Sequence, residues 1–408
     1  MTPRPRRAPH HLIPALIALT LAAVVVVGAL AYALHIEDLY IHALAPIQFP
    51  QKNQGTALQA AAFRQPDLLP IYGSSELNIS DPYHGSVIFK DYPTGFTIVP
   101  VGKAGTTSLI MLQDMAAIGR SLRGKKVALS LSAGWFFGAM PGSDSYAGNF
   151  SALHGLELAF SPYLSWDLKK EAARRMLDYP KTLEHQPVLH LAVRLEATDA
   201  VYSRPAYYLL WPIAKAQAFV LRLQDHWETV QYIHQQQKKN LDPAVPRAPR
   251  VLDWDELRKE ATAEQMKNAN NNPFGFENSR WTNNIKPQLP KPKSRTDDSF
   301  LRGIYQAKEF TDLRLLLKGL KEMGVEPLVL SMPIPGTYYD YLGVSRGARQ
   351  AYYSSVAEIA KLNGVPYRLF EDHDEDKYFI IDSGAHLSRK GWVYYDKVLD
   401  DFYHGRLR

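Results

Sequence analysis

The sequence predicts an α/β protein with a doubly wound, mainly parallel five-stranded sheet, a helical insertion and an N-terminal transmembrane helix. Short apolar runs bounded by Gly, Pro or charged residues alternate with helical patterns, and one long uncharged stretch lies near the N-terminus. Apolar runs of this kind suit strands covered on both faces, and their alternation with helices indicates a parallel sheet. In such a sheet, sites form at the carboxyl ends of the strands.

The N-terminal stretch is long enough to cross a membrane. Residues 12–34 carry no charged side chain, and three arginines precede them. A helix of about 20 residues spans the hydrocarbon core, and the positive-inside tendency places the arginines in the cytoplasm. We therefore expect a cytoplasmic tail over residues 1–11 and a single-pass anchor in the cell (inner) membrane over residues 12–34, with the rest of the chain extracytoplasmic. A cleaved signal peptide is the alternative, because residues 31–33 resemble a cleavage site, although signal-peptide apolar regions usually run only about 7 to 15 residues.

Five apolar runs mark the expected strands. They cover residues 67–72, 97–101, 127–131, 327–331 and 366–370. Periodic apolar positions predict helices between and after them, over residues 105–122, 310–323, 346–363 and 389–403.

Residues 160–300 break this alternation. An amphipathic pattern over residues 213–234 predicts a helix with Pro212 at its start, and the proline-rich residues 286–293 indicate an extended loop. Too few strand signals remain here for a second sheet. We therefore expect a helical insertion in one extracytoplasmic domain over residues 67–408, preceded by a juxtamembrane segment with a short helix over residues 35–66.

Composition excludes several classes of function. The net charge of +6 is spread over 408 residues and gives no argument for nucleic-acid binding. Because the chain has no cysteine, it has no disulfide, thiolate metal site or cysteine nucleophile. The acidic residues 371–376 lack the spacing of a calcium loop and indicate a solvated loop, so we expect neither a metal nor another cofactor. Covalent catalysis would therefore use a hydroxyl group.

Two separate segments supply the residue types of a serine catalytic site. Ser74 and Ser75 follow the first expected strand through Gly73, where a hydroxyl is exposed, rigidly placed and close to free backbone amides. An ordinary loop is the alternative for this segment alone. Near the C-terminus, Asp382 and His386 lie in a glycine-containing loop before the last helix. Histidine can take a proton from serine near neutral pH, and a carboxylate can fix its tautomer.

The two segments, found behind a membrane anchor, resemble the DltD family. The resemblance is carried by Gly73-Ser74-Ser75-Glu76-Leu77 and by the run from Asp382 to Trp392. DltD proteins are extracytoplasmic members of the teichoic acid D-alanylation system, and their fold is similar to that of SGNH (GDSL-type) hydrolases. The resemblance implies that Ser75, rather than Ser74, is the nucleophile.

The same resemblance assigns the other site residues. It implies that His386 is the base, that Asp382 orients it, that the Gly105 amide donates to an oxyanion beside the Ser75 amide, and that Trp135 walls the pocket. Three residues separate Asp382 from His386 where the family usually has two, which weakens the inference for Asp382. The segment before Trp135 also lacks the asparagine donor of ordinary SGNH hydrolases. Fewer oxyanion donors suit slow, partner-dependent transfer better than fast hydrolysis.

The function implied by the resemblance is serine-dependent acyl transfer. Ser75 would accept a D-alanyl group as an ester and pass it to a hydroxyl of an anionic envelope polymer such as lipoteichoic acid. The implied partners are the membrane acyltransferase DltB and the adenylating enzyme and D-alanyl carrier protein of that pathway. Two alternatives stay open: an exported esterase or thioesterase with the same triad, and a non-catalytic scaffold of the D-alanylation machinery.

Overall fold

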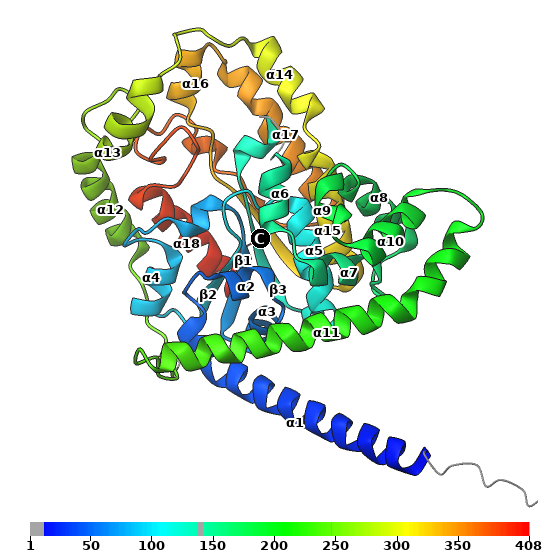
Figure 1. Ribbon diagram of the computed structural model, residues 1–408. Helices are drawn as coiled ribbons and strands as arrows, with labels where there is room; N and C mark the ends of the chain where they lie inside the picture. Colours follow the sequence, from blue (N-terminus) through cyan, green and yellow to red (C-terminus); the bar gives the residue numbers. More distant parts are fainter. Residues whose placement is uncertain (1–11, 138–141, 246, 408) are drawn as a thin grey trace, which may run out of the picture.

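The computed structural model describes residues 12–137, 142–245 and 247–407, so the cytoplasmic tail expected over residues 1–11 lies outside the described residues. One sheet of five parallel strands forms the centre, in the order β2-β1-β3-β4-β5 (Figure 1). The strands are β1 (Leu68–Tyr72), β2 (Thr97–Val101), β3 (Lys126–Leu131), β4 (Glu326–Ser331) and β5 (Tyr367–Arg368). This order is that of a doubly wound fold, which confirms the predicted class and places its crevice at the carboxyl ends of β1 and β3, where the order reverses.

Strand burial explains the apolar runs. Every residue of β1 is buried, and β2, β3 and β4 are buried except at their first residue. β5 has only two half-buried residues, fewer than the apolar run predicted, because it forms the edge of the sheet.

Helices cover both faces of the sheet. On one face α15 packs against α5 and α17, and on the other α4 packs against α18 (Figure 1). The bounds are α4 (Gly85–Asp91), α5 (Ser108–Ile118), α15 (Glu309–Met323), α16 (Gly336–Leu342), α17 (Arg346–Asn363) and α18 (Arg389–Tyr403). The four predicted helices in these regions are confirmed. The left-handed Gly364 ends α17, and the Ser388 side chain caps α18 by accepting from the Gly391 amide.

The described chain between β3 and β4 contains helices and no strand. Besides α15, its α-helices are α6 (Ser143–Asn149), α7 (Ala152–Ala159), α8 (Trp166–Met176), α9 (Pro180–Glu184), α10 (Pro187–Ala197), α11 (Ser203–Gln237), α12 (Trp254–Asn268), α13 (Asn278–Arg280) and α14 (Asp297–Gln306). The predicted start of a helix at Pro212 is wrong, because α11 begins nine residues earlier and holds Pro212 inside it. Pro212 lies on the exposed side of α11, where water can replace the backbone hydrogen bond that proline cannot make.

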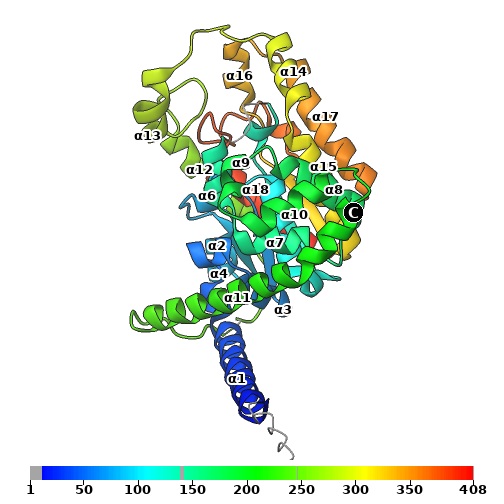
Figure 2. The ribbon, with the colours of Figure 1, turned by 45° about the vertical axis from the view of Figure 1, so that its right-hand side comes forward.

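The N-terminal helix α1 (Leu12–Leu44) has two parts. Its first part is apolar and exposed, and among the described residues it is the one helix long and apolar enough to cross a membrane. Its last part, beginning at Ala33, is buried against α11 and α3 (Ala57–Arg64), which follows the short α2 (Pro50–Gln54). Figure 2 shows the exposed part of α1 leaving the body beneath α11.

Candidate active site

Ser75 lies at the carboxyl edge of the sheet, directly after β1. It begins a single turn of 3-10 helix, Ser75–Asn78, so its backbone N–H belongs to an unpaired helix start. Gly73 permits the turn, because a Cβ there would collide with the Glu76 carboxylate and lie 2.9 Å from the Ser130 side chain. The buried strand and the tight turn together fix the position of the Ser75 hydroxyl.

A chain of hydrogen bonds joins Ser75 to residues more than 300 positions later. The Ser75 Oγ lies 2.8 Å from His386 Nε2. His386 Nδ1 lies 2.9 and 2.8 Å from the two carboxylate oxygens of Asp382. The order of hydroxyl, imidazole and carboxylate is the one in which histidine can take the serine proton while the carboxylate stabilises the imidazolium.

A closed loop holds Asp382 against His386. Ile380 and Leu387 form an antiparallel bridge, and the Ile381 amide donates to the His386 carbonyl at 2.9 Å. Inside this loop Ala385 has a left-handed φ of 61°, an unusual conformation for a residue with a Cβ. The left-handed residue turns the chain back on itself, so that the wider spacing still brings the carboxylate to the ring.

Arg280 adds a positive charge to the other side of Asp382. Its guanidinium lies 2.7 Å from Asp382 Oδ2, while the Gly384 amide donates to Oδ1 at 2.9 Å. Burial raises the pKa of Asp382, but the hydrogen bond and charge of His386, together with Arg280, outweigh it and hold the pKa below its usual value. Asp382 is therefore ionised at neutral pH.

The pKa of His386 is displaced in the opposite direction. Burial lowers it, but the hydrogen bond and charge of Asp382 and the charge of Glu76 outweigh burial, and the net effect raises the pKa above the ordinary 6.5. Glu76 is fully buried and accepts from the Ser74 amide at 2.8 Å. Burial raises the pKa of Glu76 itself.

The candidate oxyanion donors differ in their present partners. The Ser75 N–H has no acceptor within the part of the chain that the structure describes. The Gly105 N–H donates to Ser74 Oγ at 3.1 Å, so it would have to exchange that bond to meet an oxyanion. Trp135 follows β3 and is half-buried, with an enclosed indole N–H that has no partner among the described residues.

A polar hollow opens beside His386. It measures about 360 Å³ and its wall includes Arg280, Asn284, Gln288 and Tyr338, but not Trp135. The first three of these residues follow one another at a spacing of four, which places them on one side of a helical segment. Amide, guanidinium and phenol groups give this space the capacity to bind a polar, hydroxyl-bearing ligand.

Sequence reasoning missed two members of this cluster. Glu76 lies inside the Gly73–Leu77 block, and its position one residue after Ser75 was the available signal. Arg280 lies in the insertion, 102 residues before Asp382, and nothing in its local sequence marks it.

Comparison with known proteins identifies the family. The model of the DltD protein family matches residues 47–404, which include all three residues of the hydrogen-bonded chain. The chain belongs to the DltD family. It is 32% identical to Protein DltD of Bacillus subtilis (strain 168) over 354 residues, covering 87% of each chain.

Two further DltD proteins are more distant. Protein DltD of Staphylococcus aureus (strain NCTC 8325 / PS 47) is 26% identical over 349 residues, covering 86% of this chain and 84% of the relative. Protein DltD of Lacticaseibacillus rhamnosus is 25% identical over 379 residues, covering 88% and 86%. In all three comparisons most of each chain is aligned.

Proposed function

We propose that this DltD-family chain is an extracytoplasmic acyltransferase that takes part in the D-alanylation of teichoic acid or a related anionic envelope polymer. The observation that carries the proposal is the 2.8 Å contact between Ser75 Oγ and His386 Nε2. The chain's membership of the DltD family supports it, because the resemblance to that family implies the same serine chemistry. The membrane anchor α1, with its N-terminus in the cytoplasm, would hold the site outside the cytoplasmic membrane.

In the proposed first half-reaction, His386 Nε2 takes the Ser75 proton while Ser75 Oγ attacks the carbonyl carbon of a D-alanyl donor. The Ser75 N–H, and Gly105 after release of Ser74, receive the developing oxyanion. Collapse of this intermediate breaks the bond to the leaving group, which takes the proton back from His386. The products are the protonated leaving group and a D-alanyl ester on Ser75.

In the second half-reaction, a polymer hydroxyl replaces the leaving group. His386 takes its proton, the oxygen attacks the Ser75 ester, and the proton returns to Ser75 Oγ as the new ester forms. The hollow lined by Arg280, Asn284 and Gln288 is the space that we assign to the acceptor. DltB and the D-alanyl carrier pathway are the proposed source of the acyl group.

A covalent probe tests the nucleophile. A fluorophosphonate should modify the full-length chain on Ser75, and mass spectrometry should place the adduct there rather than on Ser74. Ser75→Ala should remove the adduct and, in cells that depend on this chain, the D-alanine esters of the envelope, at an unchanged amount of exported protein. D-alanine esters that persist in the Ser75→Ala strain would refute the assignment.

A second measurement separates transfer from hydrolysis. The full-length protein is given a D-alanyl thioester with or without a glycerol-phosphate polymer, and the released D-alanine and polymer-bound D-alanine are both measured. We expect the polymer-bound ester to dominate when the polymer is present. Release to water at the same rate with and without polymer would identify a hydrolase.

A further inference from the structure

The long helix α11 carries an apolar stripe that faces away from the protein body. Leu209, Ile213, Val220 and Trp227 share one side of the helix, and all are more than half exposed. The opposite side, which includes Tyr207, Ala214 and Ala218, is buried in the body. The stripe extends over about 27 Å. A continuous exposed apolar surface of this size typically marks a site that binds a protein or a membrane.

The position of α1 identifies what faces this stripe. Three side-chain contacts fix α11 across α1: Tyr32 Oη lies 3.2 Å from His234 Nε2, Glu37 Oε1 lies 2.6 Å from His226 Nδ1, and Gln237 donates to Tyr40 Oη at 2.7 Å. The exposed apolar part of α1 ends where these contacts begin. Residues 12–31 of α1 are about 30 Å long, which equals the thickness of the hydrocarbon core. If residues 12–31 span a bilayer, α11 therefore crosses α1 at the level where α1 leaves that bilayer.

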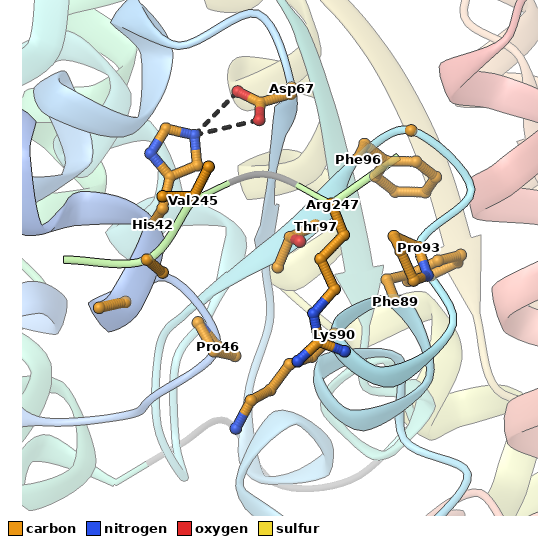
Figure 3. Close-up of a pocket in the computed structure, with 13 residues that line it drawn as sticks. His42, Pro46, Asp67, Phe89, Lys90, Pro93, Phe96, Thr97, Val245 and Arg247 are labelled. Atoms are coloured by element: carbon orange, nitrogen blue, oxygen red, sulfur yellow. Dashed lines mark hydrogen bonds and ion pairs between the residues drawn. The ribbon is translucent and has the colours of Figure 1, made fainter. Parts of the chain in front are cut away.

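Three lysines lie at the same end of the body. Lys238 and Lys239 follow α11 directly and are exposed. Lys90 lines a pocket between α4 and the last turn of α1, where His42 pairs with Asp67 (Figure 3). Lysines at this level lie within reach of the phosphates of anionic lipids.

We propose that α11 lies in the membrane–water interface and inserts its stripe into the outer surface of the same bilayer that α1 crosses. This inference rests on the proposed role of α1 as a retained anchor. A helix with one exposed apolar face and aromatic residues typically lies in this plane. In α11 the side opposite the stripe packs on the protein instead of facing water. The body is then held at two places, which fixes its tilt on the membrane.

Single cysteines can report the depth of each position, because the chain has none of its own. Full-length variants Leu209→Cys, Ile213→Cys and Val220→Cys carry a nitrobenzoxadiazole label and are reconstituted into phosphatidylglycerol vesicles whose acyl chains are brominated. Tyr305→Cys is the matched control, because Tyr305 and Leu209 are both 79% exposed and Tyr305 lies in the last turn of α14. Figure 1 shows α14 at the end of the body opposite α1 and α11. Leu19→Cys, in the exposed part of α1, is the positive control.

We expect the three stripe labels to lose fluorescence to brominated lipid as the Leu19 label does, while the Tyr305 label keeps its intensity. Stripe labels no more quenched than Tyr305, beside a quenched Leu19, would overturn the proposal and leave the anchor intact. An unquenched Leu19 would show that the anchor itself is wrong. Stripe labels shielded only after an integral-membrane partner is co-reconstituted would replace the lipid contact with a protein contact and would also overturn the proposal.

Discussion

Ala385 makes the wide spacing between Asp382 and His386 workable. Its positive φ lets the loop close through the bridge between Ile380 and Leu387, which brings the carboxylate within 2.9 Å of the imidazole. Gly384 leaves these side chains room, because a Cβ there would lie 3.1–3.2 Å from both Asp382 and His386 and would press on them. The extra residue therefore changes the backbone of the loop and leaves the contact between Asp382 and His386 in place.

Substitution of Ala385 should reveal this backbone requirement. Ala385→Val adds a β-branched side chain at a left-handed position and should reduce the free energy of unfolding by about 1–2 kcal/mol. Because the strain falls between Asp382 and His386, fluorophosphonate labelling of Ser75 should also slow. Thermal denaturation and the labelling rate measure the two effects. Ala385→Gly is the control and should retain both properties, and a Val variant equal to the Gly variant would contradict the role of the backbone.

Arg280 should set the pH range in which Ser75 can be activated. His386 must be neutral to accept a proton, so labelling falls as the pH drops through the His386 pKa, which lies above 6.5. The positive charge of Arg280 lowers that pKa, so Arg280→Gln should raise it and move the acidic limb of the labelling profile to higher pH. The exposed Arg302→Gln should leave the profile unchanged. A limb that stays in place or moves to lower pH in Arg280→Gln would contradict this account.

The sequence contained enough information to propose Ser75, His386 and Asp382, because each lies in a short motif beside a recognisable strand or helix. It did not show which other residues contact them. The position of Arg280 depends on how the whole insertion folds back over the loop after β5, and the bond from the Gly105 amide to Ser74 depends on the approach of two strand ends. Contacts between distant segments of this kind leave no local periodicity.

At the scale of elements, a buried ion pair holds the start of the segment that leads from β5 to Asp382 and His386. Arg349 on α17 is fully buried, and its guanidinium lies 2.7 Å from Asp374 and 2.6 Å from Asp340. The Gly336 amide also donates to the Asp374 carbonyl at 2.8 Å. These contacts attach the chain that leads from β5 toward Asp382 and His386 to α16 and α17.

Removal of Arg349 should destabilise the whole domain. Arg349→Met leaves the buried Asp374 without its cation and should reduce the free energy of unfolding by about 3–5 kcal/mol. Thermal denaturation of the detergent-solubilised chain measures the loss. Arg346→Met is the matched control, because Arg346 is largely exposed and lies 3.7 Å from Glu375, so its loss should cost less than about 1 kcal/mol. Equal denaturation temperatures for the two variants would rule out the proposed support.

The elements themselves were predictable to different degrees. The four buried strands and the helices beside them follow from local apolar patterns, and they match the structure within a few residues. The start of α11 could not be predicted from the local pattern. Its first two turns are stabilised by the packing of Tyr207 on Phe160 and Trp166 rather than by a capping side chain. Pro212 was therefore a misleading marker of the helix start.

For the whole molecule, if α1 is the membrane anchor that we propose, the direction of the sheet places the candidate site away from the membrane. The amino ends of β1 and β2 border the pocket beside the last turn of α1, whereas Ser75 follows the carboxyl end of β1. A strand of five residues separates the two levels by about 17 Å. A polymer that extends from the membrane surface can reach this height, which fits the acceptor class that we propose.

The last turns of α1 should belong to the domain core rather than to the anchor. Ile41 and Leu44 are fully buried, and the buried Lys52 donates to the Ala45 carbonyl at 2.9 Å. Full burial of two aliphatic side chains contributes about 3–6 kcal/mol, so a chain of residues 46–408 should be less stable than one of residues 32–408 by at least that amount. The shorter chain also leaves Lys52 without one of its acceptors, which adds to the loss. Thermal denaturation in detergent-free buffer measures the difference, and equal transition temperatures would show that the domain folds without this end of α1.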